Sequence, residues 1–349
     1  MLKTRVTNLF GIECPIIMSG MNWLTEPGLV SAVSNAGGLG ILGATHLTPE
    51  GLRENIRAIK KLTDRPFGVN QVLLVPRSRE NVKTAIDEKV PVINYALGKP
   101  WFVSQVHEYG GKVIATVATG RHAARAEQAG VDAIIITGHE AAAHGGDVTS
   151  LVLIPLVANR LKIPLIAAGG FFNGKGLAAA LVLGADAISM GTRFMLSKES
   201  VTHDKFKQLC LKAGEQDTLY HSAFDGMPGR VLRTKSAEAM MRTGVPVARW
   251  FSSALEVRRI LKLSTYEIIR SSLRMRKAEE GLSLFQQARL ATAAINAKKA
   301  IQDGDEEQGV LPAGQCCAGI EDIPSCKELI ERIVIEAEEI LKATREKII

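Results

Sequence analysis

The sequence predicts an α/β protein whose main unit is an eight-stranded βα barrel. Eight short apolar runs occur before residue 191, and each is continuous rather than alternating, which is typical of strands buried on both faces of a parallel sheet. Segments with helical character separate these runs. Charged, helix-forming sequence then replaces the alternation. We therefore expect a (βα)8 TIM barrel with a smaller, mainly helical inserted or second domain towards the C-terminus.

The strand candidates share an aliphatic, β-branched composition and a length of four to eight residues. They lie at 15–18, 39–42, 67–74, 90–94, 112–117, 133–136, 164–168 and 187–190. A doubly wound open sheet is the alternative, and it requires a Gly-x-Gly-x-x-Gly turn after the first strand. The nearest match, at 37–40, precedes a strand instead of following one. The barrel is therefore favoured.

The helices between these strands show end signals. The helix predicted over 49–62 has Thr48 at its N-cap and Pro49 at its first position. Further helices are expected at 78–88, 121–129 and 174–183. The last two each precede a glycine, Gly130 and Gly184, which suits a left-handed C-cap.

The pattern changes after about Phe206, where strand candidates vanish. Helix-forming sequence runs over 253–300, a loop is expected over 303–314, and an amphipathic helix over 326–349. We accordingly divide the chain into a barrel at 1–215, a basic helical domain on the substrate side at 216–310, and a C-terminal segment at 311–349 that closes on the barrel.

The composition, 46% hydrophobic and 5% aromatic, is that of a globular protein with an aliphatic core. No apolar run approaches the roughly 20 residues that cross a bilayer, so no membrane association is expected. No signal peptide is visible, and a cytoplasmic location is the expectation. The five cysteines, which contain no CxxC pair, are interpreted as free thiols; they are Cys14, Cys210, Cys316, Cys317 and Cys326.

The net charge of +7 is concentrated in one segment. Residues 230–277 contain twelve Lys and Arg against three Glu. Nucleic-acid binding is disfavoured, because there is no recognition motif and no interleaved aromatic residues. A solvated helical face is the commonest explanation of such a run, and an anionic substrate or an acidic partner is the alternative.

A βα barrel carries its active site at the C-terminal ends of its strands. The turn over 138–146, which follows the sixth strand, holds His139, Glu140 and His144 among glycines and alanines. Small residues permit a flat ligand to lie against the backbone while an imidazole reaches it. A zinc site is disfavoured, because the two histidines are five apart and follow a strand. No Gly-x-Ser-x-Gly elbow supports Ser-His-Asp hydrolysis.

Glycines also follow the seventh and eighth strands, at Gly169-Gly170 and Gly191-Thr192. Barrels commonly bind a phosphate with the backbone N–H groups of these two loops. The alternative is that these glycines only allow the chain to turn. No Walker motif is present, so a nucleotide cofactor such as FMN fits better than ATP hydrolysis.

Six motifs in order resemble the nitronate monooxygenase (2-nitropropane dioxygenase-like) family of FMN-dependent TIM barrels. They are Pro-Ile-Ile-Met-Ser-Gly-Met at 15–21, Ala-Gly-Gly-Leu-Gly at 36–40, Arg-Pro-Phe-Gly-Val-Asn at 65–70, Gly-His-Glu-Ala-Ala-Ala-His-Gly at 138–145, Ala-Gly-Gly at 168–170 and Met-Gly-Thr-Arg-Phe at 190–194. The resemblance ends near Phe194 and returns at 313–315. The family also includes an NADH:quinone reductase and the flavin enoyl-ACP reductases.

The resemblance implies the following roles. His144 falls on the family's active-site histidine, whereas His139 is expected to be structural, and no metal is expected. The flavin ring would be lined by Gly20, Met21 and Asn22, approached by Asn70 and contacted by Ala142. The FMN phosphate would be held by Ala168, Gly169, Gly170, Gly191 and Thr192.

Two departures from the family pattern affect the substrate. Many members have Gly-Gly before the histidine where this chain has Ala142-Ala143, which narrows the space above the ring. Some relatives place a lysine on the fifth strand, where this chain reads Ala115-Thr116-Val117. The missing positive charge would change the redox potential of the flavin.

Three functions remain open at this point. The first is the oxidation of alkyl nitronates by O₂ to a carbonyl compound and nitrite, with His144 as base or charge stabiliser. The second is an NADH-dependent reduction of quinones or enoyl thioesters on the same fold, which the basic segment supports. The third is a non-catalytic flavin-binding module. The expected partner is a small molecule (a nitronate, or NADH and a quinone), and the sequence leaves a homodimer open.

Overall fold

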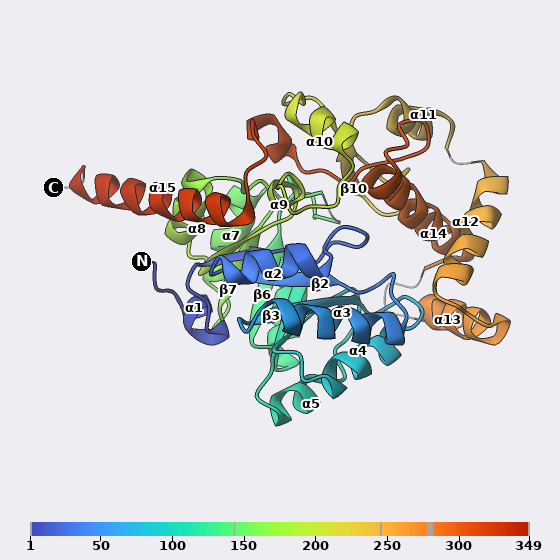
Figure 1. Ribbon diagram of the computed structural model, residues 1–349, viewed down its shortest axis with the longest axis horizontal. Coiled ribbons are helices and arrows are strands. Elements are labelled where there is room, and N and C mark those ends of the chain that lie inside the picture. Colours follow the sequence, from blue (N-terminus) through green and yellow to red (C-terminus); the bar gives the residue numbers. More distant parts are fainter. Residues whose placement is uncertain (1, 143, 245, 278–281, 348–349) are drawn as a thin grey trace.

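The computed structural model describes residues 2–142, 144–244, 246–277 and 282–347, and its centre is a closed barrel of eight parallel strands in chain order (Figure 1). The strands are β1 (Ile16–Met18), β2 (Leu39–Gly43), β3 (Phe67–Val72), β4 (Val92–Ala96), β5 (Lys112–Val117), β6 (Ala133–Thr137), β7 (Leu165–Ala168) and β8 (Ala187–Met190). β8 pairs with β1 and closes the barrel, with Ile16 opposite Ile188 and Met18 opposite Met190. The predicted (βα)8 TIM barrel is confirmed.

Helices on the outside cover the strands. After α1 (Arg5–Phe10) they are α2 (Pro27–Asn35), α3 (Pro49–Leu62), α4 (Ser78–Asp87), α5 (Val103–Glu108), α6 (Gly120–Gln128), α7 (Ser150–Ala158), α8 (Gly174–Val182) and the single turn α9 (Thr192–Met195). The end signals act as predicted. Thr48 Oγ1 accepts from Gly51 N at 3.1 Å at the start of α3. Gly130 and Gly184 have φ of +84° and +96° after α6 and α8.

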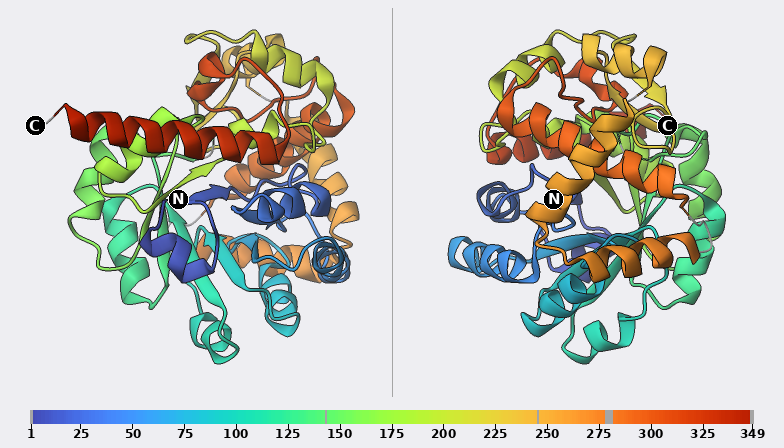
Figure 2. Two further views of the ribbon diagram at one scale, coloured as in Figure 1. Left: turned by 60° about the vertical axis from the view of Figure 1, so that its left-hand side comes forward. Right: turned by 90° about the vertical axis from the view of Figure 1, so that its right-hand side faces the viewer.

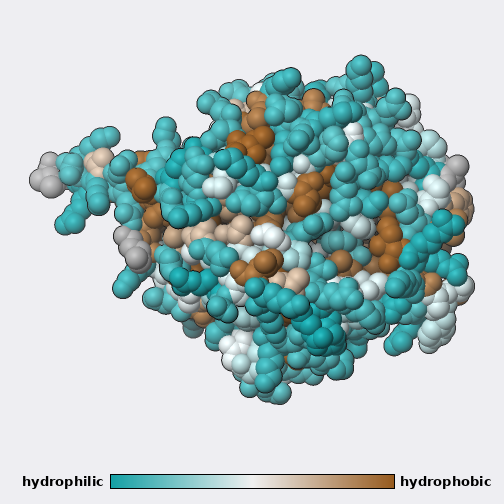
Figure 3. Space-filling model, in the orientation of Figure 1, coloured by the Kyte–Doolittle hydropathy of each residue, from teal (hydrophilic) through white to brown (hydrophobic). Residues whose placement is uncertain are grey.

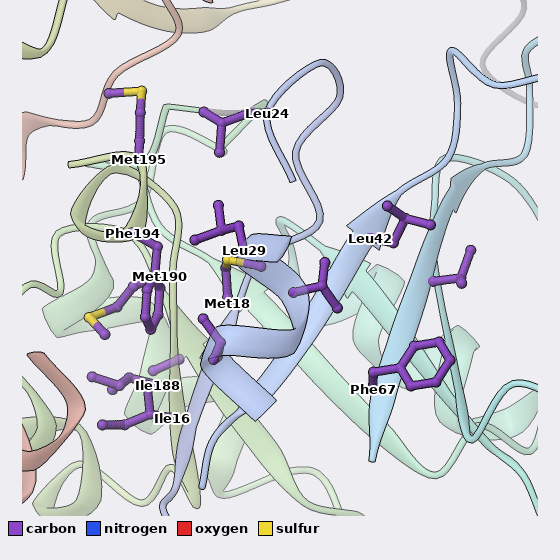
Figure 4. Close-up of a cluster of buried hydrophobic side chains, with 14 of the residues drawn as sticks. Ile16, Met18, Leu24, Leu29, Leu42, Phe67, Ile188, Met190, Phe194 and Met195 are labelled. Atoms are coloured by element: carbon purple, nitrogen blue, oxygen red, sulfur yellow. The ribbon is translucent and has the colours of Figure 1, made fainter. Parts of the chain in front are cut away.

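Two apolar layers follow from the alternation of side chains along each strand. One fills the barrel lumen with Ile17, Ile41, Ile114 and Ile166 among others, and Phe10 of α1 packs into its N-terminal end. The other lies between strands and helices. Figure 4 shows part of it, with Ile16 and Met18 of β1 beside Ile188 and Met190 of β8, and Leu29 of α2 near Met18.

The second part of the chain contains helices and one hairpin that the sequence did not reveal. After α10 (Asp204–Leu211), β9 (Thr218–His221) pairs antiparallel with β10 (Gly229–Leu232). The expectation of no strands after Phe206 is wrong, because these two strands have only four residues each and mix polar with apolar side chains, without the apolar runs of the barrel strands. Four helices follow: α11 (Lys235–Thr243), α12 (Val247–Ile260), α13 (Thr265–Lys277) and α14 (Leu284–Lys298).

These helices lie over the C-terminal mouth of the barrel (Figures 1 and 2). Three hydrogen bonds tie this second part of the chain to different loops of the mouth. Gln302, in the π-helical turn η1 (Lys299–Asp303), donates to Trp23 O after β1 at 3.2 Å, and Arg274 of α13 donates to Val75 O after β3 at 3.2 Å. Tyr220 of β9 donates to Gly145 O after β6 at 2.9 Å.

The C-terminal segment returns to the barrel through η2 (Gln315–Gly319) and α15 (Cys326–Glu346). Helix α15 runs along α8 and extends past it (Figures 1 and 2). Gly174 N at the start of α8 donates to Glu336 Oε2 at 2.7 Å. Buried Arg193 donates to Asp322 Oδ1 at 2.6 Å. Among the helices of the described residues, none is long and apolar enough to cross a membrane. The domain boundaries at 215 and 310 stay a prediction.

Candidate active site

A layer of polar side chains closes the upper end of the lumen, directly beneath the mouth. Each member lies two positions after an apolar lumen residue or glycine of its own strand, so the strand alternation turns it inward. The layer consists of Ser19, Asn70, Asn94, Thr116, Thr137 and Ser189. Only Asn70 was singled out from the sequence. The others follow apolar runs so closely that they read as ordinary strand ends.

Hydrogen bonds connect five of the six members of this polar layer, in two groups. Asn70 Nδ2 donates to Asn94 Oδ1, and Asn94 Nδ2 donates to Thr116 Oγ1 at 2.9 Å. The hydroxyls of Ser19 and Ser189 lie 2.8 Å apart. Asn70 and Asn94 are 9% and 2% exposed, so their amides are fixed by partners rather than by water. The layer is a rigid polar floor.

The loop after β1 lies on this floor. A Cβ at Gly20 would come within 2.4 Å of Asn70 Cβ, so only glycine permits the contact. Met21 is fixed by Thr25, whose hydroxyl accepts from Met21 N at 3.1 Å. Asn22 Oδ1 accepts from Thr45 N at 3.2 Å. The structure therefore brings Gly20, Met21 and Asn22 together with Asn70.

The glycines after β7 and β8 form a second group of predicted residues. Gly169 and Gly170 have φ of +103° and +84°, and Gly191 lies against Met21, whose Sδ would be 3.3 Å from a Cβ there. Thr192 Oγ1 accepts from Gly314 N at 2.9 Å. Within the described part of the chain, the backbone N–H groups of 169, 170, 191 and 192 have no hydrogen-bond partner. Ala168, the last residue of β7, is buried beneath them.

The turn after β6 is fixed by its carboxylate. Glu140 Oε2 accepts from Ser150 Oγ at 2.9 Å, and Ser150 N donates to the same carboxylate at 3.0 Å. Ser150 Oγ is also 2.9 Å from Gly169 O, which joins the β6 and β7 loops. Gln315 N donates to Glu140 O at 3.0 Å. Ala142 lies at this junction, since its nitrogen would be 3.5 Å from a Cβ at Gly314.

His144 is paired with a residue from the hairpin. Its Nε2 is hydrogen-bonded to Asp225 Oδ2, in the turn between β9 and β10. Burial lowers the pKa of His144, but the hydrogen bond and the negative charge of Asp225 outweigh burial and raise the pKa above its ordinary value. The imidazole keeps 36% of its exposure. The imidazole is therefore fixed by Asp225 and remains accessible from the mouth.

The hairpin that carries Asp225 is fixed on both sides. Arg289 of α14 donates to Ser222 O at 3.1 Å and to Ala223 O at 2.7 Å. On the barrel side, buried Arg230 donates through its side chain to His139 O at 3.2 Å. Asp225 Oδ1 also accepts from Met227 N at 2.9 Å. The carboxylate is therefore positioned by its own turn and by two elements that flank it.

His139 contacts its own turn and the hairpin, and its structural role stays a prediction. Its Nδ1 is 3.2 Å from Gly146 O, and its ring packs on Tyr220 with a centroid distance of 4.3 Å.

A third histidine at the mouth, His46, was not singled out from the sequence. His46, after β2, stacks on Trp23 at 4.2 Å, and its buried Nδ1 has no hydrogen-bond partner among the described residues. Burial lowers its pKa to about 4, so its ring is neutral near pH 7.

Sequence comparison identifies the family. A model of the family described as nitronate monooxygenase matches residues 3–83 and 75–336. The chain belongs to the nitronate monooxygenase family. As a member of this family it is an oxidoreductase.

The relatives within the nitronate monooxygenase family differ in their named substrates. A (3aS,4S,5R,7aS)-5-hydroxy-7a-methyl-1-oxo-octahydro-1H-indene-4-carboxyl-CoA dehydrogenase of Mycobacterium tuberculosis is 40% identical over 96% of both chains. A probable nitronate monooxygenase of Staphylococcus saprophyticus is 33% identical over 68% of this chain and 81% of its own. The structure of FabK from Thermotoga maritima has a TM-score of 0.81 and 36% identity, covering 99% of this chain and 100% of that one.

No group of three or more His, Cys, Asp or Glu is arranged to hold a metal ion in the part of the chain that the structure describes. The site is therefore built from a polar floor, two glycine turns and one histidine–aspartate pair. The polar floor and the glycine turns suit a planar cofactor with a phosphate, and the His144–Asp225 pair suits proton transfer.

Proposed function

We propose that the chain is an FMN-dependent oxidoreductase of acyl thioesters of coenzyme A, in which His144 exchanges a proton with the substrate. This proposal replaces the nitronate as the first choice among the substrates. One observation carries it: a basic helical domain lies over the barrel mouth and supplies the partner of His144, so that a large anionic substrate would meet positive charge at the mouth that holds the reacting group.

The residues of the site fit FMN. The amide of Asn70 is held by Asn94, and its Oδ1 accepts no hydrogen bond from the described residues, so it offers an acceptor to the polar edge of a flavin. Gly20 permits close approach. The four unpartnered N–H groups at Gly169, Gly170, Gly191 and Thr192 are a chemical match for a phosphate. Met21, Asn22, Ala142 and Ala168 would complete the contacts. FMN, when bound, supplies the two-electron acceptor or donor.

The comparisons support a thioester over a nitronate. The relative that is 40% identical over nearly the full length is named for a carboxyl-CoA substrate, whereas the probable nitronate monooxygenase is 33% identical and matches 68% of this chain. A coenzyme A ester is much larger than a nitronate, so its binding would use contacts beyond the barrel mouth.

His144 is suited to moving one proton. With Nε2 bonded to Asp225, its Nδ1 is the atom left for the substrate. In dehydrogenation the neutral imidazole takes the proton, and in the reverse reduction the imidazolium returns it. The carboxylate of Asp225 stabilises the imidazolium in both directions, which is what its effect on the pKa of His144 expresses.

Nitronate oxidation is the second candidate. The Staphylococcus saprophyticus relative favours it, and a nitronate anion would find the same imidazole–carboxylate pair. A nitronate is already deprotonated, however, and needs no base. A thioester, from which a proton must be removed, therefore gives the His144–Asp225 pair a role that a nitronate does not.

A substrate panel tests the proposal. The purified protein would first be examined for bound flavin, and the released cofactor identified by chromatography. kcat/KM would then be compared for an alicyclic acyl-CoA thioester with an artificial electron acceptor, for propionate 3-nitronate by nitrite release, and for NADH with a quinone. We expect FMN and the highest kcat/KM for the thioester. A higher value for the nitronate, or flavin-loaded protein that turns over none of the three, would contradict the proposal.

A further inference from the structure

Four arginines gather where helix α13 meets the loop after β3. Arg77 and Arg79 belong to the start of α4, and Arg270 and Arg274 lie four residues apart on one face of α13. Arg274 Nη2 is 3.4 Å from Ser78 Oγ, which brings the two elements into contact. This arginine cluster lies at the active-site end of the barrel, because loops after strands form that face.

Carboxylates neutralise the arginine cluster only in part. Arg77 pairs with Glu267 at 3.2 Å, and Glu80 lies nearby. Among the described residues, neither Arg79, Arg270 nor Arg274 forms an ion pair with a carboxylate. Arg79 and Arg270 are exposed. Burial lowers the pKa of Arg274, and the charges of Arg79 and Arg270 lower it further, so these cations repel one another.

Unused donors point to an anion. The Nε–H groups of Arg77 and Arg274 are both buried without a hydrogen-bond partner in the described structure. Helix α4, which is ten residues long, begins between them without a side-chain cap. Orphaned guanidinium donors beside an uncapped helix N-terminus match the multiple oxygens of a phosphate group.

If the arginines served only to dock α13 on the barrel, each would be directed at a carbonyl or carboxylate. Arg77 and Arg274 do donate to Lys262 O and Val75 O, at 2.9 and 3.2 Å. Arg79 instead lies 4.9 Å from the ring centroid of Trp101, and no hydrogen bond of Arg270 is present among the described residues. Docking therefore accounts for two of the four cations.

We propose that the arginine cluster of Arg77, Arg79, Arg270 and Arg274 binds the phosphates of the nucleotide end of the coenzyme A substrate. The inference rests on the proposed function. β3 and β6 are three strands apart around the barrel, so the cluster and His144 lie on different sides of the mouth. A coenzyme A thioester joins its reacting carbonyl to its nucleotide through a long pantetheine arm, and such a molecule can occupy both places at once.

The test compares a whole and a truncated thioester. Steady-state kinetics of the holoenzyme would be measured with an acyl-CoA and with the N-acetylcysteamine thioester of the same acyl group. The variants are Arg79→Ala and Arg270→Ala, singly and together, since both side chains are exposed and neither forms a hydrogen bond or ion pair within the described residues. Arg276→Ala is the matched control, because Arg276 is exposed on α13 but two positions from Arg274, on another face.

We expect each single variant to raise KM for the acyl-CoA about tenfold at unchanged kcat. KM for the truncated thioester should not change, and Arg276→Ala should behave as wild type. An unchanged acyl-CoA KM in the double variant would overturn the inference while leaving the proposed function intact. An equal loss with the truncated thioester would also overturn it.

A binding measurement separates this inference from the proposed function. Calorimetry with the holoprotein would compare coenzyme A, 3′-dephospho-coenzyme A and NADPH. If no thioester is turned over but coenzyme A binds and Arg270→Ala weakens it, the proposed function fails and the phosphate site stands. Tighter binding of NADPH than of coenzyme A would overturn the assignment to coenzyme A. If none of the three ligands binds, the proposed phosphate site at the arginine cluster is contradicted.

Discussion

His144 obtains its chemical character from Asp225, which lies 81 residues further along the chain. The turn around His144 could be recognised because histidine, glutamate and small residues follow an apolar run. Asp225 gave no such signal, since it lies in the turn between two four-residue strands and no apolar run precedes it. Residue types can indicate which side chain reacts, but its partner depends on a tertiary contact that local sequence does not encode.

Asp225→Asn tests this pair through pH dependence. Asp225 raises the pKa of His144, so removing its charge should lower that pKa. If neutral His144 is the base in dehydrogenation, kcat/KM rises with pH through this pKa. The variant should therefore shift that rise to lower pH, together with a fall in kcat of about tenfold or more. A pH profile that keeps its midpoint would show that Asp225 does not tune His144.

The raised pKa of His144 also makes the contribution of the His144–Asp225 pair to folding stability depend on pH. Because the folded protein binds the His144 proton more tightly than the unfolded chain does, this contribution is complete below the unfolded pKa of about 6.5. It is lost as pH rises through the raised folded value. The pair therefore stabilises the hairpin on the barrel most at mildly acidic pH.

At the scale of elements, the eight strands and the capped helices could be predicted because each is specified locally. Continuous apolar runs gave the strands, and Thr48 with Pro49 gave the start of α3. The β9–β10 hairpin could not be predicted this way. Its stability comes from contacts at long range, among them those of Tyr220 with Gly145 and of Arg289 with Ala223.

The packing of α15 on α8 offers an element-scale prediction. A Cβ at Gly174 would lie 2.5 Å from Glu336 Cβ and 2.6 Å from Ala337 N, so Gly174→Ala must displace α15. We expect a loss of about 1–3 kcal/mol in the free energy of unfolding, measured by urea denaturation. Gly28→Ala is the matched control, because no atom lies within 4 Å of a Cβ there. Equal midpoints for the two variants would contradict this account of the contact.

At the scale of the whole molecule, the placement of the basic segment was the largest unknown. Its charge was evident from the sequence, and both a solvated face and an anionic substrate remained open. The structure lays its helices across the mouth, where Arg274 of α13 contacts the loop after β3. Tyr220 and Gln302, which flank the segment in the sequence, contact the loops after β6 and β1. The space-filling view shows a mainly hydrophilic face on which separate apolar patches lie (Figure 3). The position of the charge, which depends on how the domains dock, supports an anionic substrate.

The anaerobic half-reaction of the flavin-loaded protein tests the central claim most directly. An acyl-CoA thioester would be mixed with wild type and with His144→Asn without oxygen, and the visible flavin absorbance followed. The thioester should bleach the wild-type flavin, and His144→Asn should slow the bleaching by about 10²-fold or more. The account would be contradicted if propionate 3-nitronate bleached the flavin while the thioester did not, or if the variant reacted as fast as wild type.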